Sequence, residues 1–510
     1  MLTFAAEDLP QLNPDSVGWL KVALCAYVIF LMAISIFASR KVENEADYLV
    51  AGRRLPLFLA FGTLIATWFG AATMFAAAGA ARDEGLLGVI LDPFACAATL
   101  VLSGLFFARP LWRMELFTMA DFYRIKYGPR AEITGACIQV PSYFAWVALQ
   151  YSALAGILNL YFEIPMTTGI LIVAGVTLIY TMIGGMWSVT LTDTIQILLA
   201  LAGLVVLTAS ALSHEGLGDG NPVRGLSVLI EKISTEHPDH LRLWPAPPED
   251  GSTLTYVSSI LGVLALWATG MFGNIPGQDL QQRVFAAKSE KTAQHACILA
   301  GVLYLCFGAL PLILGLSSLV THPEGNFDPV AFLAGEYLST GMLVIFVIAV
   351  VSMIVSTATS AVLAPATILG HNLLNRTKLF RERALLRDRL SVLFVSLGGI
   401  ALSLMGESLM GLLDMALSIQ LTALFIPVVM GLYGKPRSQT SAVLAMLFGF
   451  FTWLLTYANE LMQKSATTET FLTQLTLIPS DFYGLAASVS GYLIGQNLAG
   501  PAPEATSSQV

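Results

Sequence analysis

Hydroxyl side chains crowd one apolar stretch of the sequence, "VVSMIVSTATSAVLAPATILG" at residues 350–370. If this stretch is helical, Ser356 and Ser360 share a face at a spacing of four residues, and Thr359 lies three residues after Ser356. Hard cations prefer oxygen ligands, so the adjacent hydroxyls of Ser356 and Thr357 predict a cation site. The alternative is that these hydroxyls bond back to carbonyls of the preceding turn, as they often do in membrane helices.

A second candidate is the stretch "YTMIGGMWSVTLTDTIQ", residues 180–196, in which Asp193 and Gln196 follow a Gly-Gly pair. An ionisable side chain at the centre of a membrane helix costs about 2.5–3.5 kcal/mol, so such residues usually face a cavity, an ion path or a partner. Asp193 therefore predicts a role in coupling a cation. The alternative is an interfacial aspartate that caps the next helix through its amide groups.

Two apolar segments are interrupted by glycine or proline, at residues 56–80 ("LIATWFGAATM") and 254–277 ("LWATGMFGNIPG"). Interrupted helices at corresponding positions in two halves of a membrane protein indicate a transport site, because unwound backbone frees carbonyls for a cation. The alternative for the first segment is close helix packing through small residues, with Gly70 and Gly79 as contact points.

The composition is that of a polytopic membrane protein. Of 510 residues, 56% are hydrophobic and only 12% are charged, whereas soluble domains carry about 25% charged residues. The net charge of -8 argues against nucleic acid as a partner. We also expect no enzyme activity, because the histidines show no metal-ligand spacing and the sequence has neither a phosphate-binding loop nor a nucleophile elbow.

Because lipid offers the backbone no hydrogen-bond partners, each spanning segment is expected to be a helix. We predict an all-α protein with a single transmembrane domain over residues 1–510 and a disordered cytoplasmic tail at 499–510. About thirteen segments are long enough to span. They lie near residues 17–38, 56–80, 86–108, 133–160, 164–187, 191–213, 254–277, 293–319, 338–370, 389–406, 411–432, 440–461 and 480–498.

Positive charges concentrate in one set of loops. Of the 26 Lys and Arg residues, 20 fall within residues 40–54, 109–130, 283–291, 376–389 and 435–437. Because basic loops stay on the cytoplasmic side, we expect the N-terminus outside and the C-terminus in the cytoplasm. The acidic segment 214–253 then becomes an external loop.

Four motifs together resemble the sodium:solute symporter family, over most of residues 45–440: "ADYLVAGRRLP", "YTMIGGMWSVTLTDTIQ", "DLQQRVFAAKSEK" and "VSTATSAVLAPATILGHNL". The resemblance implies the leucine-transporter fold, whose core has two inverted repeats of five helices. The first repeat would cover about residues 56–213 and the second about 254–432.

The resemblance also implies how sodium is bound. Backbone carbonyls and neighbouring hydroxyls would supply the ligands, and an aspartate would assist sodium near its cytoplasmic exit. The implied ligands are the carbonyls of Ala66, Phe69 and Met353 and the hydroxyls of Ser356 and Thr357, with Asp193 as the aspartate.

Within the family, "ATWFG", "SGLFFARP" and "YSALAG" are most similar to the choline carrier branch, which cages a quaternary ammonium with tryptophans. Trp68 and Trp146 stand at two of those aromatic positions, but Gly277 and Leu413 stand where that branch has further tryptophans. A choline cage is therefore incomplete. The candidate solute-binding residues are Trp68, Trp146, Gln150, Asn274, Gln278 and Asp414, where Asp414 has the alternative role of an external helix cap.

These observations predict a sodium-driven importer of a small organic solute, such as an amino acid or a quaternary amine. We expect a monomer in a plasma membrane, and a bacterial inner membrane fits the short external segments. Two alternatives stay open: a proton-coupled carrier of the same fold, and a membrane sensor that binds solute without transporting it.

Overall fold

The computed structural model describes residues 14–39, 45–248, 251–325, 327–406, 408–434, 438–463 and 476–498. Within these ranges the chain is helical apart from turns and short connections, and its β-pairing is limited to an isolated bridge between Leu55 and Ala287. The predicted all-α architecture is thus confirmed, while the tail at 499–510 lies outside the described residues.

Long helices make up most of the fold, and several begin at a serine whose side chain caps the first turn, as Ser252 and Ser289 do for α11 and α13. The long helices are α1 (Pro14–Ser39), α8 (Pro129–Phe162), α9 (Met166–Leu212), α11 (Thr253–Gly273), α13 (Glu290–Thr321), α15 (Thr340–Ile368), α17 (Ala384–Ser403), α20 (Gln439–Gln463) and α22 (Ser480–Leu498).

Shorter elements complete or connect these helices. They are α2 (Glu45–Val50), η2 (Ala51–Arg53), α3 (Leu57–Trp68), η3 (Ala72–Ala76), α4 (Ala77–Glu84), η4 (Ile90–Ala95), α5 (Cys96–Leu102), η5 (Ser103–Phe107), α6 (Ala108–Trp112), α7 (Met119–Tyr127), α10 (Pro222–Glu236), η6 (Pro238–Leu241), α12 (Gln278–Ala286), α14 (Pro329–Tyr337), η7 (Leu369–Leu373), η8 (Leu374–Arg376), α16 (Lys378–Arg381), α18 (Leu409–Gln420), η9 (Leu421–Phe425) and α19 (Ile426–Tyr433).

Within the described part of the chain, nine helical stretches are long and apolar enough to cross a membrane, or ten if one bent pair counts as a span. Every one of the thirteen predicted segments contains helix. The number thirteen stays a prediction, because several of these helices are too short or too polar to qualify by length and composition alone.

The first predicted interruption is present. Helix α3 ends at Trp68, the backbone of Phe69 leaves the helical region with ψ at 76°, and helical structure resumes at Ala72. The two halves are bent by 59° at this break. Non-helical backbone at membrane depth occurs only where protein encloses it or where it lines a cavity. This break therefore marks a candidate site.

The second interruption is also present, but the span continues further than predicted. Helix α11 ends at Gly273 and α12 begins at Gln278, with the amide of Gly277 donating to the carbonyl of Asn274 at 2.9 Å. The predicted end at residue 277 is therefore wrong, because the polar residues of α12 are buried rather than in a loop.

Helix α9 contains both the fifth and the sixth predicted segments. The hydroxyls of Tyr180 and Thr192 are 2.9 Å apart, although twelve residues of straight helix would separate their positions by about 18 Å. The chain therefore bends sharply between these residues. Asp193 follows this bend and lies inside α9, so the alternative that it caps a new helix is wrong.

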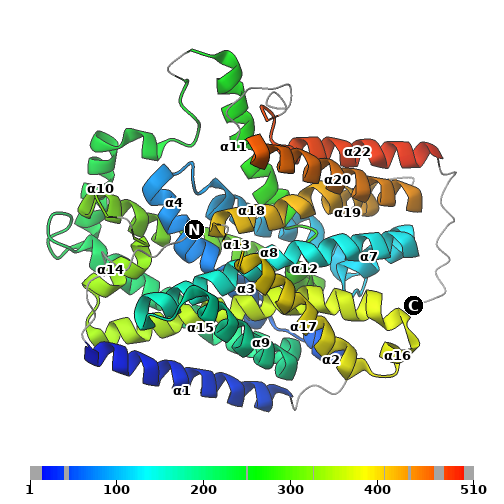
Figure 1. Cartoon of the computed structure of the whole chain (residues 1–510), viewed down its shortest axis with the longest axis horizontal. Coiled ribbons are helices and arrows are strands. Elements are labelled where there is room, and N and C mark those ends of the chain that lie inside the picture. Colours follow the sequence, from blue (N-terminus) through cyan, green and yellow to red (C-terminus); the bar gives the residue numbers. More distant parts are fainter. Residues whose placement is uncertain are drawn as a thin grey trace.

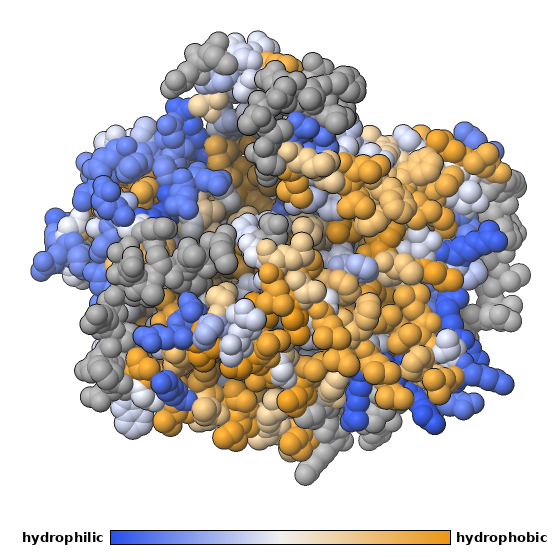
Figure 2. All heavy atoms as spheres, in the orientation of Figure 1, coloured by the Kyte–Doolittle hydropathy of each residue, from blue (hydrophilic) through white to orange (hydrophobic). Residues whose placement is uncertain are grey.

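The polar parts of the molecule lie at opposite ends (Figure 1). Helices α10 and α14 are at one end, and α16, within the basic segment 376–389, is at the other. Figure 2 shows hydrophilic residues over these two ends and a broad hydrophobic surface between them. This distribution fits a membrane-spanning body whose predicted external and cytoplasmic loops face opposite sides.

Candidate functional site

The break after α3 packs against the middle of α15. The hydroxyl of Thr357 on α15 donates to the carbonyl of Ala66 at 2.9 Å and to that of Met353 at 3.2 Å. Three of the five implied sodium ligands therefore lie around one point. Phe69, a fourth, ends α3 with a non-helical backbone, and its ring packs on Tyr304 at a centroid distance of 5.6 Å.

The fifth implied ligand, Ser356, lies beside the predicted aspartate. Ser356 donates a hydrogen bond to Oδ1 of Asp193, and Thr63 on α3 donates to Oδ2 at 2.5 Å. Asp193 has no solvent exposure (0%). Three helices, α3, α9 and α15, thus meet at one buried carboxylate.

Neighbouring hydroxyls on α15 behave differently. Thr359 bonds back to the carbonyl of Val355 at 2.7 Å, as the alternative for this helix requires. Thr357 also bonds back, to the carbonyl of Met353, but in addition it reaches Ala66 on α3, and Ser356 reaches Asp193 on α9. Among the described residues no cluster of three or more His, Cys, Asp or Glu could hold a metal ion, so a cation here would depend mainly on hydroxyl and carbonyl oxygens.

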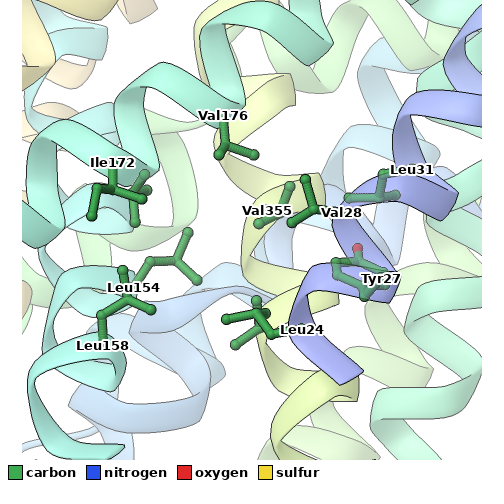
Figure 3. A pocket seen from close by; sticks show the side chains of 11 residues that line it. Leu24, Tyr27, Val28, Leu31, Leu154, Leu158, Ile172, Val176 and Val355 are labelled. Atoms are coloured by element: carbon green, nitrogen blue, oxygen red, sulfur yellow. The ribbon is translucent and has the colours of Figure 1, made fainter. Parts of the chain in front are cut away.

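Gln196, the partner of Asp193 in the sequence motif, points elsewhere. Its amide donates to the hydroxyl of Tyr27 on α1 at 2.5 Å. Tyr27 borders an apolar pocket of about 80 Å³ between α1, α8, α9 and α15 (Figure 3). Leucine and valine side chains such as Leu154 and Val355 line this pocket, so it offers no groups to orient a polar solute.

Among the candidate solute residues, Trp68 and Gln150 adjoin the break in α3. The indole of Trp68 donates to Oδ2 of Asp279 at 3.0 Å, and Oε1 of Gln150 accepts from the amide of Ala71 at 3.3 Å. The Nε2 group of Gln150 and the indole nitrogen of Trp146 are buried and have no hydrogen-bond partner in the described structure. Two donors on α8 are thus available near the break.

The other three candidates are placed differently. Gln278 accepts from the amide of Met119 at 2.7 Å and donates to the carbonyl of Phe117 at 3.2 Å, so its side chain anchors the chain before α7. Asn274 lies in the break after α11, 3.8 Å from the sulfur of Cys96. Asp414 is half-buried on α18, whose cap is the hydroxyl of Ser408, so the cap alternative for Asp414 is wrong.

Sequence reasoning missed a buried polar cluster on α12. Asp279 is 4% exposed, and Oδ1 of its carboxylate accepts a hydrogen bond from the hydroxyl of Tyr143 on α8. Arg283 is 1% exposed and lies inside the protein. The prediction that it belongs to a basic cytoplasmic loop is therefore wrong. The motif "DLQQR" contained the signal, since it places four polar residues among five, and polar residues that become buried need hydrogen-bond partners.

Arg283 connects the two halves of the site. Its guanidinium donates to the carbonyl of Asp279 at 3.0 Å and to the hydroxyl of Ser360 at 2.5 Å. It also interacts electrostatically with the carboxylates of Asp193 and Asp279. A fixed positive charge therefore stands between the hydroxyls of α15 and the start of α12.

A hydrogen-bond network lies just beyond the C-terminal end of α15. Asn372 donates to both Asp121 and Glu132 at 2.9 Å, and Arg376 pairs with Glu132. Burial of Asp121 favours its neutral form, but hydrogen bonding and charge from His371 hold the pKa of this carboxyl below its usual value. The carboxylate is therefore charged near neutral pH, and the network ties α15 to α7 and α8.

The profile of the sodium:solute symporter family matches residues 48–449. This chain belongs to the sodium:solute symporter family. The match covers both breaks, α15 and Asp193, so the resemblance seen in the four motifs is confirmed.

Members of this family with curated names are similar over most of the symporter chain. A high-affinity choline transporter 1 of Caenorhabditis elegans is 26% identical over 466 residues, which cover 83% of this chain and 75% of that protein. The sodium/pantothenate symporter of Escherichia coli is 25% identical over 498 residues, which cover 95% of this chain and 97% of the relative.

Solved structures share the fold of this symporter. A substrate-bound, outward-open Na⁺-coupled sialic acid symporter superposes with a TM-score of 0.75 at 16% identity, covering 95% of this chain and 98% of the other. MhsT in complex with L-phenylalanine gives a TM-score of 0.52 at 14% identity, covering 86% and 98%. The predicted helical transporter fold is thus confirmed, while the bounds of the two repeats stay predictions.

Gly70 offers a test of this symporter's site without removal of any ligand. A Cβ at Gly70 would lie 2.9 Å from Cγ2 of Thr357 and 3.1 Å from Oε1 of Gln150, whereas a Cβ at Gly79 meets nothing within 4 Å. We expect Gly70→Ala to push α15 from the break and to raise the sodium concentration for half-maximal uptake about tenfold. Gly79→Ala is the matched control and should change this concentration less than twofold; equal effects of the two variants would contradict the prediction.

Proposed function

We propose that this protein is a sodium-coupled secondary active symporter that imports a small organic solute by alternating access. The observation that carries the proposal is the group of oxygens around Thr357, which joins the broken α3 to α15. Hard oxygens from a helix break and a facing helix suit a hard monovalent cation. Membership of the family supports the same assignment.

In this proposal sodium binds at Ala66, Phe69, Met353, Ser356 and Thr357. It replaces the hydrogen bond that now links Thr357 on α15 to the Ala66 carbonyl on α3. Asp193 lies one hydrogen bond from Ser356 and would draw the ion toward its cytoplasmic exit. Binding of sodium would hold α3 against α15, so that solute meets a completed site between the two breaks.

The sodium gradient would supply sufficient free energy. A monovalent cation that moves through about 100 mV releases about 2.3 kcal/mol. A tenfold concentration gradient adds about 1.4 kcal/mol, so one sodium ion supports accumulation of a neutral solute by a few hundredfold. We place the protein as a monomer in a bacterial inner membrane, with its N-terminus outside.

Purified protein in proteoliposomes tests this function. With an inward sodium gradient, radiolabelled choline, proline, glucose and pantothenate are offered singly, and we expect at least one to accumulate. Replacement of external sodium by potassium should lower that uptake to the level of empty liposomes. Uptake that continues in potassium would refute sodium coupling.

A proton-coupled carrier is the second candidate, and one observation favours it. Asp193 is a titratable group in the core of the protein, held by Thr63 and Ser356. An inward pH gradient applied without sodium distinguishes the two candidates. Accumulation under that gradient alone would assign the coupling to protons.

A further inference from the structure

The carboxylate of Asp279 lies where the two helix breaks meet. Asp279 is on the first turn of α12, directly after the break that follows α11. The indole of Trp68, at the end of α3, donates to its Oδ2 at 3.0 Å. The hydroxyl of Tyr143 donates to Oδ1 and accepts from the Asp279 amide at 3.0 Å. Residues from three helices thus hold one buried carboxylate at the centre of the fold.

Gly277 makes room for this carboxylate. A Cβ at residue 277 would lie 2.9 Å from Oδ1 of Asp279 and 3.5 Å from the hydroxyl of Tyr143. The same Cβ would lie 2.8 Å from the carbonyl oxygen of Asn274, so any side chain at this position would displace the carboxylate or the backbone of the break. The absence of a side chain at Gly277 thus leaves space beside the break, and the carboxylate of Asp279, two residues later, occupies that space.

The carboxylate oxygens of Asp279 accept hydrogen bonds only from the neutral groups of Trp68 and Tyr143 among the described contacts. No Lys, Arg or His within the described residues forms an ion pair with this carboxylate. Arg283 bonds the Asp279 carbonyl and acts on the carboxylate only through its charge, which also acts on Asp193. A buried charge is costly unless it is paired, and two neutral hydrogen bonds compensate it only in part. A cationic group on a ligand would complete the pairing.

Further buried donors follow Tyr143 along α8. Tyr143, Trp146 and Gln150 follow one another at spacings of three and four residues, which places them on one stripe of the helix. From Tyr143 to Gln150 the stripe rises by about 10 Å. The indole N–H of Trp146 and Nε2 of Gln150 are buried without an acceptor. The stripe thus has an anion at one end and unused donors further along.

From this arrangement we infer that the solute carries a protonated amine that donates N–H to Asp279 and an acceptor group that receives N–H from Trp146 and Gln150. The inference rests on the proposed function, since it assigns the solute of that same site. Small amino acids and amino alcohols have both groups within the length of the stripe. Neutral sugars and anions lack the cation.

The structure favours an amine with N–H over a quaternary ammonium. A quaternary ammonium has no N–H to donate and is bound mainly by aromatic faces that surround it. At Gly277 there is no space for an aromatic wall, because even a Cβ approaches Oδ1 of Asp279. A carboxylate that accepts hydrogen bonds is instead the group presented beside the break.

Binding to purified protein in detergent tests the inference. Thermal unfolding is followed in sodium with proline, ethanolamine, choline, glucose or pantothenate, and a Kd is obtained from each shift. We expect proline or ethanolamine to bind at least tenfold more tightly than choline, and glucose and pantothenate to give no shift. Tightest binding by choline, glucose or pantothenate, or no binding by either amine, would overturn the inference.

Asp279→Asn keeps the shape of the side chain and removes its charge. We expect this variant to weaken binding of the amine solute at least tenfold while sodium alone still shifts its unfolding temperature. Asp92→Asn is the matched control, because Asp92 is also buried and also accepts two hydrogen bonds, from Thr73 and Tyr304. It should leave the order of preference among the five solutes unchanged.

The two proposals fail in different ways. An unchanged Kd for the amine in Asp279→Asn would overturn the assignment of Asp279, even if uptake by the wild type depends on sodium. Loss of the sodium effect in the wild type would refute sodium coupling but leave the solute preference measurable. A Kd change of equal size in Asp92→Asn and Asp279→Asn would likewise overturn the assignment.

Discussion

Replacing Ser356 and Thr357 together by alanine is expected to raise the sodium concentration for half-maximal uptake about 30-fold or more. Thr357 is the hydroxyl that contacts the carbonyls of Ala66 and Met353, and Ser356 links this group to Asp193. A hydrogen bond or ligand contact to a charged group contributes about 1.5–3 kcal/mol. Loss of two such oxygens, partly compensated by water, weakens the free energy of sodium binding by about 2 kcal/mol or more.

Initial uptake rates at several sodium concentrations measure this effect. The KM for the solute at saturating sodium should change much less, because the solute does not contact these hydroxyls in the proposed site. Thr359→Ala is the matched control on the same helix, since its hydroxyl bonds only to the carbonyl of Val355 in the described contacts. Equal sodium activation in the control and the double variant would argue against a cation at this position.

The sequence made the helix breaks predictable, and also the presence of hydroxyls on α15. Glycine and proline interrupt a helix through their own backbone properties, so the interruption can be predicted from the local sequence. Helices α3 and α11 accordingly end at Trp68 and Gly273. The positions of the hydroxyls along α15 also follow from the local sequence. It did not decide which hydroxyls leave their own helix, because that depends on what faces them: Thr357 meets the break, whereas Thr359 does not.

The cluster on α12 was not predictable in the same way. The sequence predicts a loop for the basic residues at 283–291, because hydropathy alone cannot distinguish an exposed polar turn from a buried one. Asp279 and Arg283 are buried only because α12 packs between α3, α8 and α15. The partners of Asp279, Trp68 and Tyr143, are more than 130 residues away in the chain, so tertiary packing alone brings them together.

Arg283 is the residue whose loss is expected to affect stability most. It is buried, donates to Ser360 and to the Asp279 carbonyl, and interacts electrostatically with the carboxylates of Asp193 and Asp279. Arg283→Met fills a similar volume without charge and leaves these two buried carboxylates without a fixed cation. Removal of one partner from a buried charge cluster costs about 3–5 kcal/mol, so the unfolding temperature should fall clearly.

Sodium should then stabilise Arg283→Met more than it stabilises the wild type. In the wild type the guanidinium opposes a second positive charge near Asp193, and without it sodium is the cation available to that carboxylate. Tighter sodium binding gives a larger rise in unfolding temperature at a fixed sodium concentration. Arg82→Met is the matched control, because Arg82 is also buried but bonds Ser318 and loop carbonyls at the end of α13. It should lower the unfolding temperature without changing the sodium-induced shift, and the same shift in both variants would show that Arg283 does not act on the cation site.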